Sequence, residues 1–185
     1  LFLFLNLYSN NINQNKEISL EVFQIFSPIN KFDKNLIKLD IINKIKKSNA
    51  EYLVFAENNY PYLISDINTI EISEYIKDSK KVIIGTTRIE KSKFYNSFLF
   101  IEKDNIQIFD KKILVPFGEF LPFRSYLGFL ENISGYVDYT PGSNERIIKS
   151  SDEVKILPVI CYEIIFNKIL KKINEKEIDL LINIT

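Results

Sequence analysis

The amino-acid sequence predicts an α/β domain in which a mixed sheet is covered by helices. Strand-like apolar segments alternate with segments whose apolar residues recur at helical spacing, which is typical of parallel strands joined by helices. Two other strand-like segments, 94–102 and 106–110, are separated only by residues 103–105, which predicts an antiparallel hairpin. With 185 residues, of which 46% are hydrophobic, the chain is long enough for one domain with a substantial core.

The predicted elements follow one another from residue 18. Residues 18–24 alternate apolar and polar side chains, as a half-buried strand does. Four isoleucines at helical spacing predict a helix over 36–48: Ile37, Ile41, Ile42 and Ile45. After the helix we expect a buried strand at 51–57, a helix at 69–77, a strand at 81–87, the hairpin, a buried strand at 154–160 and a final apolar strand that includes 181–185.

Cys161 is the only cysteine, and it lies where a predicted strand is followed by a predicted helix over 164–173. A side chain at such a junction is held at the end of a rigid sheet. The unpaired backbone N–H groups of the first helical turn lie beside it and can stabilise a developing negative charge. A free cysteine can equally be a small buried hydrophobe without chemistry. Cys161 is therefore a candidate nucleophile only in combination with other residues.

The composition excludes several kinds of site from the residues of this chain. Twenty-four basic side chains balance 24 acidic ones, so no overall field favours nucleic acid or anionic lipid. With one cysteine and no histidine, the chain lacks Ser-His-Asp and Cys-His pairs and zinc sites made of Cys and His. If Cys161 is a nucleophile, its base within this chain is a carboxylate or a lysine.

Charged residues follow two of the predicted strands. Glu57 is the last residue of the strand expected at 51–57, and Lys111 and Lys112 come after the second hairpin strand. Active sites of open α/β sheets collect at strand ends, although any α/β protein has charged residues in its loops. In an extended segment, Lys111 shares a face with apolar neighbours, whereas Lys112 shares the other face with Asp110, which we expect to be solvated.

Three motifs in chain order, FAENNYP, FDKKILVPFGEFLP and ICYE, resemble the Glu, Lys and Cys motifs of the nitrilase superfamily of carbon-nitrogen hydrolases. The form LVPFGEFLP resembles the membrane-bound branch of that superfamily, the apolipoprotein N-acyltransferases. The likeness extends from about Ile18 to Thr185. It implies a nitrilase-like α-β-β-α sandwich with mixed sheets, truncated at the C-terminus. The chain departs from the family pattern at Phe55-Ala56, where Trp-Pro is usual, and has no tryptophan.

The resemblance also implies roles for individual residues. Glu57 matches the general base, Lys111 the cation at the tetrahedral intermediate and Cys161 the nucleophile. Three further residues match supporting positions of the motifs: Glu119, Tyr162 and Glu163. For each of the two glutamates, a solvated loop acid is the alternative that the residues alone leave open.

The segment after Lys111 is rich in large apolar side chains. Phe117, Phe120, Leu121 and Phe123 lie within it, and further apolar residues continue to residue 130. If the segment is a loop, these side chains are exposed and suit an acyl chain or a membrane surface. A helix buried against the sheet is the alternative.

The resemblance implies transfer of an acyl chain from a phospholipid, through a thioester on Cys161, to the N-terminal amino group of a lipidated apolipoprotein. It implies no metal or organic cofactor, and it places the catalytic domain on the periplasmic side of the bacterial inner membrane. We expect residues 1–16 to be the end of a transmembrane helix with a polar linker, and residues 17–185 to be an incomplete catalytic domain, because both ends look cut. For residues 1–8, an apolar strand or arm of a soluble domain is the alternative that the residues alone leave open. The alternatives are a soluble nitrilase-type amidase that hydrolyses a small C–N bond and a non-catalytic α/β domain.

Overall fold

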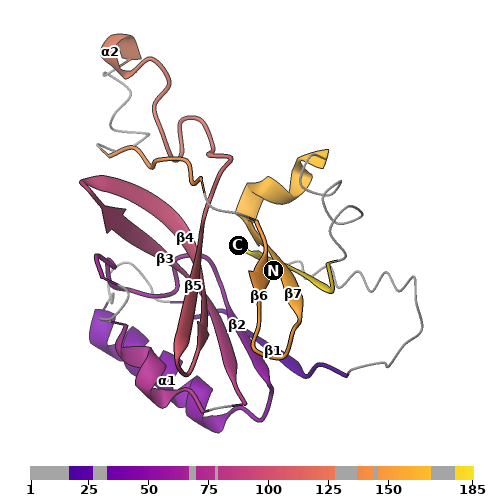
Figure 1. Cartoon of the computed structure of the whole chain (residues 1–185). Helices are drawn as coiled ribbons and strands as arrows, with labels where there is room; N and C mark the ends of the chain where they lie inside the picture. Colours follow the sequence, from indigo (N-terminus) through magenta and orange to yellow (C-terminus); the bar gives the residue numbers. More distant parts are fainter. Residues whose placement is uncertain are drawn as a thin grey trace.

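The computed structural model describes residues 17–26, 33–66, 70–77, 79–127, 137–143, 146–167 and 178–185. These residues form two β-sheets that pack face to face, with helix α1 (Lys34–Lys47) on the outer face of the larger sheet (Figure 1). The predicted α/β class is confirmed, and the described part contains three layers of the expected sandwich. Residues 1–16, which we expect to end a transmembrane helix, lie outside these ranges. Within the ranges, no helix is long and apolar enough to cross a membrane.

The larger sheet has the strand order β1-β2-β3-β4-β5. Its strands are β1 (Leu20–Phe23), β2 (Tyr52–Phe55), β3 (Lys81–Glu90), β4 (Lys93–Glu102) and β5 (Asn105–Asp110). The first three strands are parallel, and β3, β4 and β5 form two antiparallel hairpins. Because β5 reverses β4, it runs in the same direction as β2. The residues that follow β2 and β5 therefore emerge at the same edge of the sheet.

The smaller sheet contains β6 (Ile148–Lys149), β7 (Lys155–Ile160) and β8 (Leu180–Ile184). The parallel pair of β7 and β8 confirms the two strands predicted near the end of the chain. Strand β6 pairs antiparallel with β7 and was not predicted, because two residues are too few to show a period.

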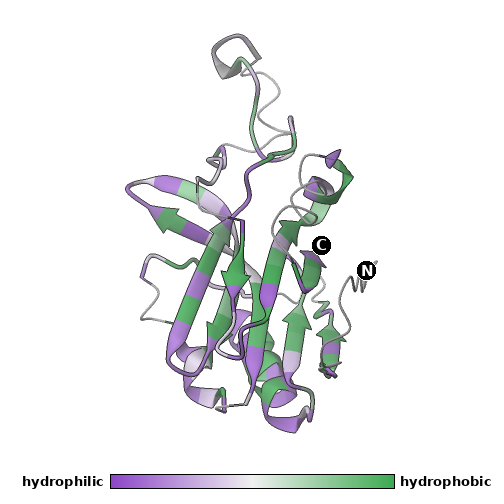
Figure 2. Cartoon of the chain, turned by 45° about the vertical axis from the view of Figure 1, so that its right-hand side comes forward, coloured by the Kyte–Doolittle hydropathy of each residue, from purple (hydrophilic) through white to green (hydrophobic). Residues whose placement is uncertain are grey.

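Strand β2 is buried on both faces, which explains why its sequence is continuously apolar rather than alternating. Leu53 and Phe55 pack in the cluster that includes α1, whereas Tyr52 and Val54 pack between the two sheets. Figure 2 shows the same distribution, with mostly hydrophobic strands at the centre and hydrophilic residues gathered at the ends of the elements.

Local signals set the ends of α1. The side chain of Asp33 accepts hydrogen bonds from the backbone N–H groups of Asn35 and Leu36, as an N-cap does. At the other end, the buried ammonium of Lys80 donates to the carbonyl oxygens of Ile45 and Ser48. The positive charge also interacts favourably with the carbonyl end of the helix dipole. Burial lowers the pKa of Lys80 below its ordinary value.

The helix predicted at 69–77 is instead a short 3-10 helix, η3 (Glu71–Tyr75). Ile70, Ile72 and Ile76 are all buried. An α-helix would turn Ile70 and Ile72 to nearly opposite sides, because they are two positions apart. A tighter and shorter segment lets all three side chains reach the same core.

Candidate functional site

Three charged side chains meet at the edge where β2 and β5 end. The Lys111 ammonium is 3.0 Å from both carboxylate oxygens of Glu119 and 3.6 Å from Oε1 of Glu57. Lys111 is only 1% exposed, and the two carboxylates are mostly covered. The structure thus brings together two of the predicted catalytic residues and one predicted supporting residue. A buried cation beside two carboxylates has its charge strongly coupled to theirs.

Sequence reasoning missed Asn96, which completes this cluster. Its side-chain Nδ2 lies 2.6 Å from Oε1 of Glu57 and 2.7 Å from Oε1 of Glu119. Asn96 is buried on β4, on the same face of the strand as Phe98 and Phe100, whose side chains point between the sheets. A single amide in an otherwise apolar row was the available signal.

A close approach of two backbones fixes Glu57. A Cβ atom on Gly85 would lie 2.6 Å from the Cα of Glu57 and 2.6 Å from the backbone nitrogen of Asn58, so only glycine fits there. Asn58 has a positive φ of 54°, and Oδ1 of Asn59 accepts hydrogen bonds from Ile25 and Ala56. The turn that presents Glu57 is therefore held from two sides.

Asp110 is not on a solvated face, so that prediction was wrong. Its carboxylate is buried and accepts two hydrogen bonds from Arg88, at 2.7 and 3.2 Å, and one from Ser97 at 2.6 Å. Burial alone would lower the pKa of Arg88, but the bonds to Asp110 and Glu90 raise it above its ordinary value. Gly142 also packs directly on the backbone of Asp110. Asp110 is thus paired with Arg88, whereas Lys111 interacts with Glu57 and Glu119.

Cys161 is the first residue of the 3-10 helix η5 (Cys161–Ile165), immediately after β7. Its φ is 51°, in the left-handed region that non-glycine residues rarely adopt and that is common at functional sites. The thiol is half-buried against the core between the sheets, 3.5 Å from Oγ1 of Thr185. The expected turn from strand to helix is present, although most of the helix predicted at 164–173 lies outside the described residues.

Glu163 connects the Cys161 segment with the Lys111 segment. Its fully buried carboxylate accepts hydrogen bonds from the backbone N–H groups of Lys112 and Ile113, at 2.9 and 3.0 Å, and from Ile160 at 3.1 Å. The residue after Lys111 is thereby tied to a residue two positions after Cys161. Glu163 is thus not a solvated loop acid.

The guanidinium of Arg146 neutralises the buried carboxylate of Glu163. Its guanidinium binds both carboxylate oxygens of Glu163, at 2.7 and 3.1 Å, and both side chains are buried. A buried carboxylate without its cation is strongly unfavourable. The sequence motifs did not point to Arg146, because it lies outside them.

Replacing Arg146 with methionine is expected to lower the free energy of unfolding by about 3–5 kcal/mol, because it leaves the Glu163 charge buried and unpaired. Lys149→Met is the matched control, since it breaks the exposed ion pair of Lys149 with Glu153 and should cost about 1 kcal/mol or less. Urea denaturation of the purified proteins measures both. Similar losses of unfolding free energy in the two variants would show that the buried Arg146–Glu163 pair does not stabilise the fold.

The segment after Lys111 exposes part of its apolar content. Phe117, Phe123 and Tyr126 are exposed, the last two by 77% and 83%. Tyr126 belongs to the short helix α2 (Arg124–Leu127), which Figure 1 shows at the far end of a segment that rises away from the two sheets. The described part of this segment is therefore not a helix buried against the sheet.

Two residues of this segment are less exposed than expected. Phe120 is half-buried, and Leu121 is only 3% exposed, so exposure was the wrong expectation for Leu121. The Leu121 N–H also donates to Oδ1 of Asp138, 2.9 Å away, so its backbone is fastened to another segment. Tyr162, next to the thiol, is 48% exposed and packs edge-on against Phe166.

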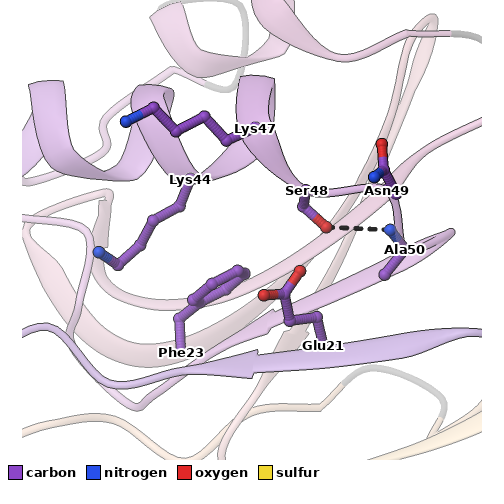
Figure 3. A pocket seen from close by; sticks show the side chains of 7 residues that line it. All are labelled: Glu21, Phe23, Lys44, Lys47, Ser48, Asn49 and Ala50. Atoms are coloured by element: carbon purple, nitrogen blue, oxygen red, sulfur yellow. Dashed lines mark hydrogen bonds between the residues drawn. The ribbon is translucent and has the colours of Figure 1, made fainter.

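An open pocket of about 480 Å³ lies between β1 and the end of α1 (Figure 3). It is lined by Glu21, Phe23, Lys44, Lys47, Ser48, Asn49 and Ala50, none of which is a predicted site residue. Over the ranges described above, no three Cys, Asp or Glu side chains are grouped as metal ligands would be.

Comparison with curated proteins identifies several relatives named apolipoprotein N-acyltransferase. The protein from Rickettsia typhi is 34% identical over 125 residues, which are 66% of this chain and 24% of that protein. The protein from Rhizobium rhizogenes is 30% identical over 150 residues, 73% of this chain and 28% of that protein. The protein from Helicobacter pylori is 31% identical over 146 residues, 72% and 33%. The chain thus spans about a quarter to a third of the length of these relatives. No protein-family model matches it.

Solved structures with the same fold include a carbon-nitrogen hydrolase from Helicobacter pylori. It matches with a TM-score of 0.61 and 16% identity, over 90% of this chain and 59% of that chain. A mutant amidase from Nesterenkonia sp. AN1 matches with a TM-score of 0.62 and 12% identity, over 95% of this chain and 67% of that chain. At these identities the likeness concerns the fold, and it confirms the predicted nitrilase-like architecture.

Proposed function

We propose, since the chain belongs to the apolipoprotein N-acyltransferase family of the nitrilase superfamily, that it forms the catalytic centre of a lipoprotein N-acyltransferase. The observation that carries the proposal is the buried cluster of Lys111 with Glu57 and Glu119, linked to the Cys161 segment through Glu163. In this proposal Glu57, Lys111 and Cys161 are the catalytic residues. Glu119 orients Lys111, and Glu163 orients the backbone beside Cys161.

In the first step, Glu57 accepts the proton of the Cys161 thiol, and the thiolate attacks the ester carbonyl of a phospholipid. The Lys111 ammonium and the N–H of Tyr162 stabilise the oxyanion. When the C–O bond breaks, the leaving lysophospholipid oxygen takes the proton from Glu57. The acyl chain then remains on Cys161 as a thioester.

In the second step, the free amino group of the lipidated N-terminal cysteine of an apolipoprotein attacks the thioester. Glu57 accepts a proton from the nitrogen, an amide forms, and the C–S bond breaks to release the Cys161 thiolate. The proton on Glu57 returns to that thiolate, and the site is restored. This order of events is a ping-pong reaction with two substrates and one acyl-enzyme.

The exposed aromatic side chains support a lipid substrate over a small amide. In this proposal Phe117, Phe123 and Tyr126 contact the acyl chain or the membrane surface near the site. Phe120 lies beside them and is covered in part. The proposal places the centre at the periplasmic face of the bacterial inner membrane, where lipid and apolipoprotein are both available.

Replacing Phe123 with serine is expected to lower acyl transfer from phospholipid vesicles at least 10-fold, because burying one such side chain in lipid contributes about 1.5–3 kcal/mol. Phe26→Ser is the matched control, since Phe26 is 83% exposed and lies before α1. The measurement is the initial rate of acylation of a diacylglyceryl peptide by the full-length protein. Equal effects of the two substitutions on the rate would show that Phe123 does not contact the lipid.

The competing function is a soluble amidase, which the nitrilase-like fold also permits. The two activities separate directly when the full-length protein is offered a phospholipid with a diacylglyceryl peptide, or small aliphatic amides. We expect acylated peptide from the first mixture and no ammonia above background from the second. Ammonia release without peptide acylation would favour the amidase, and neither product would favour a non-catalytic domain.

A further inference from the structure

We propose that Asn96 is a positioning residue of this site and that its side-chain amide holds the carboxylates of Glu57 and Glu119 in place on either side of Lys111. The inference rests on the proposed function, which uses Glu57 as the base. It extends that function by a residue that lies outside all three motifs.

The distances distinguish the two carboxylates. The Lys111 ammonium is 3.0 Å from both oxygens of Glu119, so Glu119 is its closer ion-pair partner. Glu57 is farther from the ammonium, at 3.6 Å, and its short contact is the 2.6 Å hydrogen bond from Asn96. Asn96 is therefore the principal hydrogen-bond donor to the proposed base within the described part of the chain.

The charges explain why a neutral donor belongs here. Two carboxylates with one ammonium leave an excess negative charge, and carboxylates at close range repel each other. Nδ2 of Asn96 donates to one oxygen of each carboxylate, so one neutral side chain holds the two groups in place.

The contacts also leave one oxygen of Glu57 for chemistry. Asn96 and Lys111 both approach Oε1. Among the residues that the structure describes, no hydrogen bond or ion pair reaches Oε2, and in this proposal it takes the proton from the Cys161 thiol or from the incoming amine. The amide thus fixes which oxygen of the base acts.

The amide oxygen of Asn96, Oδ1, indicates that the residue is present for its function and not for stability. Its Oδ1 is buried and has no hydrogen-bond partner among the described residues. Reversing the amide would place Oδ1 against two carboxylates, so the orientation is settled. A buried acceptor without a partner is unfavourable, and an apolar side chain like those of Phe98 and Phe100 would avoid that cost. The two hydrogen bonds that Nδ2 donates to Glu57 and Glu119 offset this cost.

The test is the pH dependence of Cys161 acylation in the full-length protein, with Asn96→Leu as the main variant. Leucine has a similar size and no donor. We expect its rate at neutral pH to fall at least 10-fold, and the acid limb of its pH–rate profile to move to higher pH, because the hydrogen bonds to the two carboxylates are lost. Asn96→Ser keeps one donor and is expected to lie between Asn96→Leu and the parent. It also provides the measurement if the leucine variant does not fold.

Ser97→Ala is the structural control, because Ser97 is buried on the same strand but bonds to Asp110. It should change stability without moving the acid limb. Superimposable profiles for the parent and both Asn96 variants would overturn the inference. Each protein is assayed with a phospholipid donor and with a short-chain p-nitrophenyl ester. If only the ester acylates Cys161, the proposed function fails, while the profile with the ester still decides the role of Asn96.

Discussion

Replacing Cys161 with alanine is expected to reduce acyl-enzyme formation to background. The proposed reaction passes through a bond to this sulfur, and no other cysteine is present in the chain. Retention of a labelled acyl chain by the full-length protein, after incubation with labelled phospholipid and removal of free lipid, measures the effect. Transfer to a diacylglyceryl peptide should disappear in parallel.

The serine variant tests whether the nucleophilicity of the sulfur, and not the size of the side chain, is required. Cys161→Ser keeps the size and a hydroxyl group but replaces a thiol by a much weaker nucleophile. It is expected to fold as the parent does and to retain little transfer. Normal turnover in the alanine variant would end the thioester mechanism, whatever the behaviour of the serine variant.

Replacing Lys111 with methionine is expected to lower the acylation rate by about 10²–10³, the usual loss when one donor to an oxyanion is removed. Lys111 is buried beside two carboxylates, and its ammonium is the nearest cation to Glu57 and Glu119 in the described structure. The rate is measured as a single turnover of Cys161 acylation by a phospholipid in membranes, at matched amounts of protein.

Lys112→Met is the matched control, since the two lysines are adjacent in the sequence. Lys112 is half-buried, and its backbone N–H donates to Glu163. This variant should stay within a few-fold of the parent. Equal losses at the two positions, or a larger loss at Lys112, would show that the assignment of Lys111 is wrong. A fall in folded protein is monitored separately, because Lys111→Met also leaves the two carboxylates without their cation.

The sequence predicted those parts of the fold that depend on regular patterns. The four isoleucines of α1, the alternation in β1 and the short gap between β4 and β5 each have one simple physical interpretation. The same patterns could not resolve η3, where burial of Ile70, Ile72 and Ile76 decides the conformation. Local periodicity is informative only where a segment buries a single face.

The motifs predicted that Glu57, Lys111 and Glu119 belong to one site, and the structure places them in contact. They could not predict Asn96 or Arg146, because each acts on a residue far away in the sequence, and each looks like an ordinary polar residue locally. The surroundings of Asp110 were missed for the same reason.

Peptide mapping of the full-length protein by mass spectrometry, after reaction with a phospholipid of defined acyl chain, tests the central proposal most directly. We expect the peptide that contains Cys161 to gain the mass of that acyl chain. The adduct should be removed by hydroxylamine, as a thioester is, and lost when a diacylglyceryl peptide is added, with the chain recovered as an amide on that peptide. An unmodified Cys161 peptide while peptide acylation proceeds, or an adduct on another residue that turns over at the same rate, would contradict it.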